Sequence, residues 1–165
     1  MSLNIRVGQS LMLQQWLKEA EIDLAILQVF SDQMMPGDRE LWREDLLWVQ
    51  AADHPASLGK RIPFVSFDRN CFYRLAARQR LADSGRSLDV VLECPSAEGV
   101  RAGVRHGLGV ALLNSRNLVP GLVEIGSDLP KFPQVVHVLR SRNGTASELE
   151  RSLGETVIQE LSDDS

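Results

Sequence analysis

The chain has 165 residues, of which 44% are hydrophobic, and its 22 acidic and 18 basic side chains give a formal net charge of -4 at pH 7. This length and apolar content allow a buried core, in one domain or in two small lobes. The acidic balance argues against a nucleic-acid-binding surface over the whole molecule, and no apolar run approaches the roughly 18 residues needed to cross a bilayer.

Short β-type runs alternate with helical patterns along the chain. Two runs, Leu24–Leu27 and Val110–Leu113, are continuously apolar, which is typical of strands buried on both faces of a parallel sheet. The alternation predicts an α/β fold with parallel strands and right-handed crossovers. The predicted strands are Asn4–Val7, Ile22–Leu27, Leu46–Ala51, Phe64–Phe67, Asp89–Glu93, Gly109–Leu113, Leu122–Ile125 and Val135–Arg140.

Four stretches predict helices between these strands. The first carries apolar residues at positions i, i+3, i+4 and i+7, namely Leu13, Trp16, Leu17 and Ala20. Others are predicted over Cys71–Asp83 and Ala97–Leu108, the latter ending at Gly107 and Gly109, where a C-cap would lie. The last begins at Ser147, which forms a capping box with Glu150.

The order of elements predicts two lobes. Residues 59–127 form a self-contained strand–helix–strand–helix–strand unit, which we assign to the second lobe. The strand Val135–Arg140 and the final helix are expected to return to the first lobe, which then comprises residues 1–55 and 131–165. Two chain crossings between α/β lobes create a cleft of the kind that binds small ligands.

The best candidate binding segment runs from Phe64 to Arg74, through a strand end, a loop and a helix start. It holds four of the chain's six Phe and Tyr residues. The crevice beyond the carboxyl ends of parallel strands is the usual ligand site, and helix N-termini there attract anions. Alternatively, the aromatic residues are core and the polar ones cap the helix, with Asp68 or Asn70 as N-cap. The candidate ligand contacts are Ser66, Phe67, Asp68, Asn70, Cys71, Phe72 and Tyr73.

Three residues from other elements complete the predicted site. Ser96 follows the next strand and suits an N-cap, which alone could explain it. Gln28 and Val29 end the central strand of the first lobe and are expected to face the same cleft. Gln28 could hydrogen-bond a ligand or simply solvate the strand end.

No catalytic, cofactor or metal-binding constellation is evident. The three histidines lie on different element types without ligand spacing, and no Ser-His-Asp or Cys-His set can be argued. Cys71 and Cys94 are too few and too far apart for a disulfide framework or a metal site. We expect two reduced thiols, a cytoplasmic setting and no enzymatic activity. The arginines of the second and third helices are expected to face water: Arg74, Arg78, Arg80, Arg101 and Arg105.

Four stretches carry a family pattern, in the family's order. Trp16–Ile26 resembles L-x-x-G-x-L-D-L-A-I, and Leu47–Val49 followed by Asp53–Pro55 is similar to a strand followed by H-P-L. Arg86–Glu93 matches a short helix-to-strand link, and Ala102–Leu113 resembles A-A-V-x-A-G-L-G-V-A-L-L. Together they resemble the effector-binding domain of bacterial LysR-type transcription regulators.

This resemblance implies a two-lobe fold like that of type 2 periplasmic binding proteins, with a small anionic or aromatic effector in the cleft. It implies transcription regulation by DNA-bound dimers or tetramers of the intact protein, and homodimerisation through Asn4–Val7 and the following helix. DNA binding would require an N-terminal winged helix-turn-helix, which this sequence lacks, and the family's first strand–helix unit is also expected to be missing. A solute-binding protein of a transport system shares the fold but would need an export signal. An enzyme on this fold would need an acid–base pair.

Overall fold

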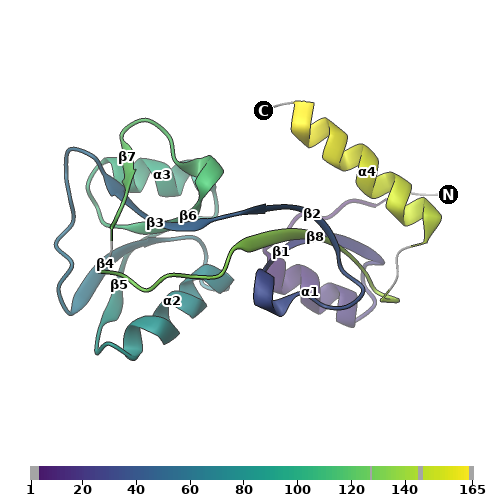
Figure 1. The fold of residues 1–165 in the computed structure, drawn as a ribbon, viewed down its shortest axis with the longest axis horizontal. Coiled ribbons are helices and arrows are strands. Elements are labelled where there is room, and N and C mark those ends of the chain that lie inside the picture. The colour runs from purple at the N-terminus through teal and green to yellow at the C-terminus, as the bar shows by residue number, and fades with distance from the viewer. Residues whose placement is uncertain (1–3, 127, 145–146, 164–165) are drawn as a thin grey trace. The chain divides into compact units, whose positions relative to one another are not determined.

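The structure, a computed structural model, describes residues 4–126, 128–144 and 147–163 (Figure 1). The chain forms two compact units, residues 1–43 with 135–165 and residues 44–134. The boundary thus falls at Glu44, whereas the sequence pattern extended the first lobe to residue 55. Among the described residues, no helix is long and apolar enough to span a membrane.

Unit 1 is built on a three-stranded sheet of order β1-β8-β2. Strand β1 (Leu24–Phe30) runs antiparallel to β8 (Val135–Ser141), with Leu24 opposite Ser141 and Phe30 opposite Val135. Strand β2 (Arg39–Glu44) forms the other edge and ends at the first residue of unit 2.

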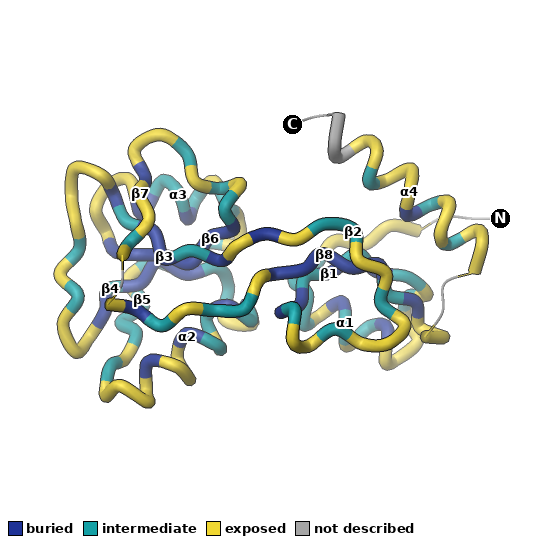
Figure 2. The backbone as a smooth tube through the Cα atoms, in the orientation of Figure 1, coloured by how far each residue is buried: buried dark blue, intermediate teal, exposed yellow. Residues whose placement is uncertain are grey.

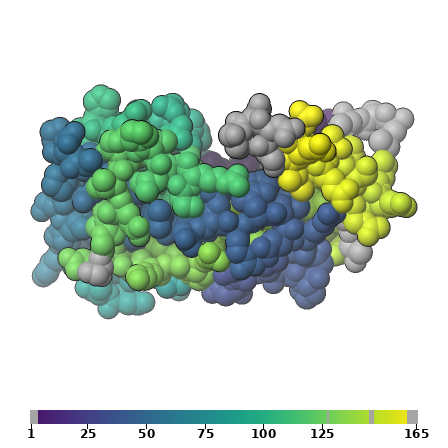
Figure 3. Space-filling model, turned by 45° about the horizontal axis from the view of Figure 1, so that its top comes forward, coloured from purple at the N-terminus to yellow at the C-terminus, as the bar shows by residue number. Residues whose placement is uncertain are grey.

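Two helices cover opposite faces of this sheet. Helix α1 (Ser10–Lys18) packs Leu13 and Leu17 against alternate residues of β1 and β8, among them Leu27 and Val136. Helix α4 (Glu148–Asp163) places Gly154 against Leu139, where an added Cβ would lie 2.7 Å from Leu139 Cδ2. Figure 3 shows α4 on the surface of unit 1. Within the sheet, the His137 ring stacks on Trp42 with the centroids 4.1 Å apart.

Unit 2 combines two small sheets. Strands β6 (Ala111–Asn114), β3 (Leu46–Ala51) and β7 (Leu122–Glu124) form an antiparallel sheet in that order. Strands β4 (Arg61–Ser66) and β5 (Ser87–Glu93) pair in parallel, and a parallel bridge joins Phe64 to Val110. Figure 2 shows β6 and most of β4 as buried.

Helices α2 (Phe72–Ala82) and α3 (Ala97–Arg105) follow the two parallel strands. Helix α3 buries Val100 and Val104 in a core with Val65, and its Gly103 permits close packing, since an added Cβ would lie 2.7 Å from Leu92 Cδ2. Helix α2 returns to β5 through an exposed turn in which Gly85 has φ +67° and nothing within 4 Å of an added Cβ.

The predicted helices are confirmed, and so is the capping box. The backbone N–H of Ser147 donates to Glu150 Oε2 at 2.6 Å, and the backbone N–H of Glu150 donates to Ser147 Oγ at 3.3 Å. Strand β3 has the predicted bounds.

The expectation of parallel strands throughout is wrong, because β1–β8, β3–β6 and β3–β7 are antiparallel. The run Leu24–Leu27 buries only alternate residues, Ala25 and Leu27, so its continuous apolar character did not report a doubly buried strand. Helices pack on both faces of this sheet, so residues on both sides of β1 are apolar although the strand is antiparallel to its neighbour.

Two further strand expectations differ from the structure. Asn4–Val7 forms no strand, and Ile5 and Val7 are exposed, so the strand edge proposed for a dimer contact is not formed. Strand β2 was not expected, because its sequence, RELWRE, is mostly charged and lies at a sheet edge.

Candidate ligand-binding site

Two strand-to-helix corners lie side by side at one edge of unit 2. Strands β4 and β5 end together, with Ser66 opposite Glu93, and the backbone N–H of Cys94 donates to the Ser66 carbonyl at 3.0 Å. Helix α2 begins at Phe72 and helix α3 at Ala97, so both N-termini start near this edge. The sequence prediction of a site at carboxyl ends of parallel strands therefore has the required local geometry here.

The β4–α2 corner is shaped by a turn that the Asp68 side chain closes, before the helix begins. Asp68 Oδ1 accepts a hydrogen bond from the Asn70 N–H at 2.9 Å, which forms a local turn. The N-cap residue is Cys71, and no side chain hydrogen-bonds to the cap of α2. The expectation that Asp68 or Asn70 caps this helix is wrong, because both precede the cap and Asp68 folds the loop instead.

Ser66 is the unusual polar residue of this corner. It is fully buried, and its Oγ has no hydrogen-bond partner among the residues that the structure describes. Since neighbouring strand residues alternate sides and Val65 packs toward Gly103 of α3, Ser66 faces away from α3. An unpaired buried hydroxyl costs about 1–3 kcal/mol, so this group calls for a partner, either a bound water or a ligand.

The aromatic residues divide between core and surface. Tyr73 is buried, and its hydroxyl donates to Asn114 Oδ1 at 2.5 Å; burial raises the pKa of this phenol above its usual range. Phe67 and Phe72 are half-buried and contact the Tyr73 ring, with centroids 6.4 and 4.5 Å away. Tyr73 is thus an anchor, and the two phenylalanines offer partly accessible apolar surface.

The Cys71 thiol lies at the start of α2. Burial raises its pKa, against the opposing effect of the backbone N–H groups of Tyr73 and Arg74. Arg74, only 13% exposed, binds Glu93 at 2.7 Å and so ties the first turn of α2 to the end of β5. The expectation that Arg74 faces water is therefore wrong.

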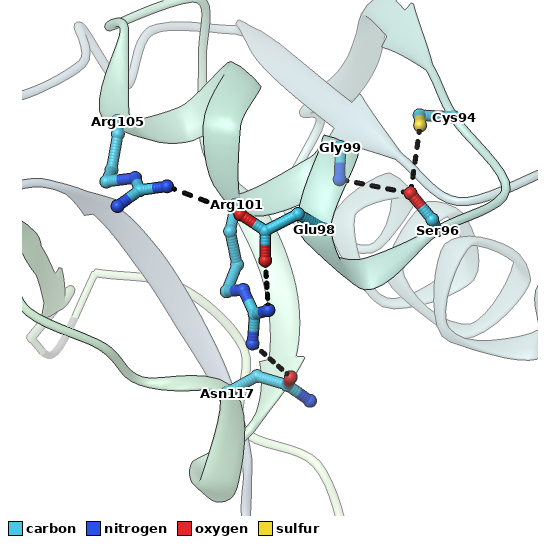
Figure 4. A network of polar contacts seen from close by, with 7 residues as sticks. All are labelled: Cys94, Ser96, Glu98, Gly99, Arg101, Arg105 and Asn117. Carbon is cyan, nitrogen blue, oxygen red and sulfur yellow. Dashed lines mark hydrogen bonds and ion pairs between the residues drawn. The ribbon is translucent and has the colours of Figure 1, made fainter.

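The β5–α3 corner is capped as predicted (Figure 4). Ser96 Oγ accepts from the Gly99 N–H at 3.1 Å and lies 3.6 Å from Cys94 Sγ. Hydrogen bonds from the backbone and side chain of Ser96 lower the pKa of the half-buried Cys94 thiol. Gly99 makes room for that thiol, because an added Cβ would collide with Sγ.

The charged network along α3 explains its arginines. Glu98 forms ion pairs with Arg101 and Arg105, and Arg101 also donates to Asn117 Oδ1 at 3.0 Å (Figure 4). Arg101 is 21% exposed at its side chain, so it too is partly buried against partners rather than solvated.

The two predicted contacts of unit 1 lie at the end of β1. The backbone N–H of Gln28 donates to Ser10 Oγ at 3.0 Å, and Val29 is buried in the core beside α1. Their participation in a common site with Ser66 stays a prediction.

Sequence reasoning did not find Asn114 and Glu44. Asn114 is buried, receives the Tyr73 hydroxyl and donates through Nδ2 to Glu44 Oε2 at 3.3 Å. Their separation from Tyr73 along the chain hid this relation, although a polar residue directly after the apolar run Val110–Leu113 was a usable signal.

The two corners suit binding better than catalysis. They offer the N-terminus of α2, a buried hydroxyl and half-buried rings, a set that can hold an anionic group on a small molecule. Within residues 4–126, 128–144 and 147–163, no group of three or more His, Cys, Asp or Glu side chains could hold a metal ion.

Comparison with known proteins supports a common fold. Residues 1–162 match the family model described as LysR substrate binding domain. The chain is 25% identical over 141 residues to the HTH-type transcriptional regulator PecT of Dickeya dadantii (strain 3937), covering 84% of this chain but 44% of PecT.

Solved regulatory domains show the same fold at low identity. The CcmR regulatory domain of Synechocystis PCC6803 in complex with 2-PG aligns with TM-score 0.68 and 18% identity, covering 96% of this chain and 82% of that one. The apo-form regulatory domain of HypT from Salmonella typhimurium aligns with TM-score 0.70 and 15% identity, covering 98% and 83%. The predicted α/β fold of the two-lobe, type 2 periplasmic-binding-protein kind is confirmed.

Proposed function

The chain belongs to the family of LysR substrate-binding domains, and from that premise we propose that it senses a small anionic effector at the β4–α2 and β5–α3 corners. The observation that carries this proposal is the buried Ser66 hydroxyl, which has no partner among the described residues. The proposed contacts in unit 2 are Ser66, Phe67, Asp68, Asn70, Cys71, Phe72, Tyr73 and Ser96.

The electrostatics of α2 favour an anion. The helix has 11 residues, no acidic residue lies in its first turn, and the backbone N–H groups of Tyr73 and Arg74 face the Cys71 sulfur, a weak acceptor. The first backbone N–H groups of a helix lack intrahelical acceptors, and the helix dipole adds partial positive charge there. A carboxylate or phosphate oxygen would be a stronger acceptor for these N–H groups than the thiol and would also lie in the favourable field of the helix dipole.

Ser66 supplies a second reason for a ligand. Its hydroxyl can donate one hydrogen bond, and the cost of its burial is removed if a ligand oxygen accepts that bond. Reaching this hydroxyl requires some opening of the corner, which is how binding could be converted into a conformational change.

The effector's apolar part would lie on the half-buried rings of Phe67 and Phe72. The Tyr73 ring, held in place by the hydrogen bond from its hydroxyl to Asn114, contacts both of these rings. The CcmR regulatory domain with 2-PG supports a small anionic effector for this chain by analogy of fold.

The wider role is regulatory. The chain spans 44% of the length of PecT, so we propose that it controls the DNA-bound dimers or tetramers of an intact regulator. An effector can do so only if it binds one conformation of the domain more tightly than another. Neither corner presents an acid–base pair, so we infer sensing rather than catalysis.

Ligand-induced thermal stabilisation would test this function. We would screen small carboxylates and phosphate esters, 2-PG included, against the parent chain and two serine variants. Ser66→Ala removes the buried hydroxyl; Ser87→Ala removes an exposed hydroxyl at the opposite end of the same strand pair. We expect a stabilising ligand whose effect is lost in Ser66→Ala and kept in Ser87→Ala. An equal response of both variants would contradict the proposed site.

A further inference from the structure

We propose a second small-molecule site in unit 1, a hollow of about 640 Å³ that takes an organic acid with an apolar body. It lies between α1, the loop Met35–Asp38 and the end of β8. Its volume falls in the range of ligand pockets, about 300–1,000 Å³.

The hollow is independent of the proposed effector site. All its lining residues belong to unit 1, whereas Ser66 and both corners belong to unit 2. Within unit 1 it also lies at the other end of β1 from the predicted effector contacts. Arg140, which lines the hollow, pairs with Ala25, whereas Val29 pairs with Val136 near the far end of the strand.

A buried ion pair fixes one wall. The Asp38 carboxylate is fully buried and accepts from Arg140 Nε and Nη2 at 2.6 Å each, and from the Met35 N–H at 2.8 Å. A paired, two-point contact of this kind is among the stronger and more directional interactions of proteins. It holds the loop after β1 against β8, so this wall exists before any ligand arrives.

Two glycines of the lining, Gly37 and Gly144, bring the loop after β1 and the segment after β8 into direct backbone contact. An added Cβ on Gly37 would collide with the Gly144 carbonyl oxygen, so the two backbones touch directly. Gly144 has φ +80°, a conformation that favours glycine. The close approach again indicates a preformed hollow rather than a transient gap.

The lining is mainly apolar with a positive rim. Leu11, Leu17, Met35 and Pro36 contribute apolar surface, and Met35 is 56% exposed. Small-molecule pockets are lined mainly by apolar side chains with a few polar groups. This surface would hold the body of the ligand.

The charges favour an acid. Asp38 is neutralised by Arg140, and Arg142 pairs with Asp23 at 2.9 Å. Lys18 is exposed at the end of α1 and lines the hollow, and its ammonium group has no hydrogen bond or ion pair among the described residues. The Gln14 amide lies beside it on the same helix. A carboxylate would meet this ammonium while the apolar body lies on the leucine and methionine side chains.

Nuclear magnetic resonance of the ¹⁵N-labelled 165-residue chain can test the proposal with 4-phenylbutyrate as probe and 4-phenyl-1-butanol as its uncharged counterpart. We expect the acid to shift amide signals of α1, residues 35–38 and residues 140–144, and to bind more tightly than the alcohol. Lys18→Gln should weaken binding about three- to fivefold, as expected for one exposed ion pair. Lys60→Gln, an exposed lysine of unit 2, should leave it unchanged.

A second variant protects the test against misfolding. Gln14→Trp places a bulky ring in the hollow from a half-buried helix position and should abolish binding while the dispersed spectrum persists. Ser66→Ala should bind the probe like the parent, which separates this site from the effector site. The proposal is wrong if the probe does not bind, if the shifts centre on residues 66–73 and 94–99, if acid and alcohol bind equally, or if Lys18→Gln behaves like Lys60→Gln.

Discussion

The Tyr73 hydroxyl hydrogen-bonds to Asn114 Oδ1 at 2.5 Å, which ties the first turn of α2 to the end of β6 across 41 residues of sequence. Asn114 in turn donates to Glu44, the first residue of unit 2. This buried chain of polar groups links the candidate site to the point where β2 enters unit 2.

Asn114→Ala should lower the free energy of unfolding by about 2–3 kcal/mol, because the substitution leaves the buried Tyr73 hydroxyl without its acceptor and takes one donor from Glu44. Asn70→Ala, at an exposed loop position, is the matched control and should stay within about 0.5 kcal/mol of the parent. Urea denaturation gives both values. Similar losses for the two variants would contradict a structural role of the Tyr73–Asn114 bond.

Alkaline titration can follow Tyr73 alone, because it is the chain's single tyrosine. Burial raises its pKa in the folded chain, whereas in the unfolded chain it should titrate near the usual value of about 10. Stability from this group is therefore complete below about pH 10 and falls as the pH rises further. Phenolate absorbance at 295 nm should appear near pH 10 in urea but be delayed in buffer. Coincident curves would show that the phenol is accessible.

The two cysteines should differ in reactivity. The pKa of Cys94 is lowered by hydrogen bonds from Ser96, and its side chain is half-buried, whereas Cys71 is buried and its pKa is raised. Since the thiolate is the nucleophile, iodoacetamide at neutral pH should modify Cys94 first and Cys71 only on unfolding. Peptide mass spectrometry reads out both positions. Ser96→Ala should slow the reaction of Cys94, and preferential labelling of Cys71 would overturn this assignment.

Ser66→Ala should leave the free energy of unfolding unchanged or raise it by up to about 1 kcal/mol, because no hydrogen bond is lost and an unpaired hydroxyl is removed from the core. Ser141→Ala is a matched substitution of a buried serine with hydrogen-bond partners and should cost about 1 kcal/mol. A marked loss for Ser66→Ala would reveal a hidden partner and weaken the argument for a ligand.

Arg140→Met should destabilise the chain by about 3–5 kcal/mol, because it leaves the buried Asp38 carboxylate without its counter-ion. Arg39→Met removes a partner from the exposed pair with Glu155 and should cost less than about 1 kcal/mol. Thermal and urea unfolding should rank the two variants in this order. Equal effects would mean that the Asp38–Arg140 pair contributes no more than a surface contact.

The sequence predicted the helices and the cap of the β5–α3 corner well, because their signals are local. The spacing of apolar residues located α2 and α3, and Ser147 with Glu150 located the start of α4. Ser96 was recognised as an N-cap for the same reason.

Strand direction and the polar core were not predictable in this way. The pairing of β1 with β8 joins segments more than 100 residues apart, and an apolar run does not specify direction. The cap of α2 was misassigned because Asp68 closes a turn that only three-dimensional geometry reveals. The unpaired state of Ser66 likewise depends on atoms from distant segments.

The hydrogen bond from the Cys94 N–H to the Ser66 carbonyl has a consequence for sensor engineering. It joins the ends of two strands, so the two corners are held directly to each other. The exposed turn at Ser84 and Gly85 connects to the opposite end of β5, and Ser84 is the position there where a side chain can be enlarged, because the φ of +67° reserves the next position for glycine. A fluorescent reporter attached at Ser84 would lie at the end of the strand pair that is opposite the proposed ligand-binding end, so this turn is a suitable attachment point for a biosensor.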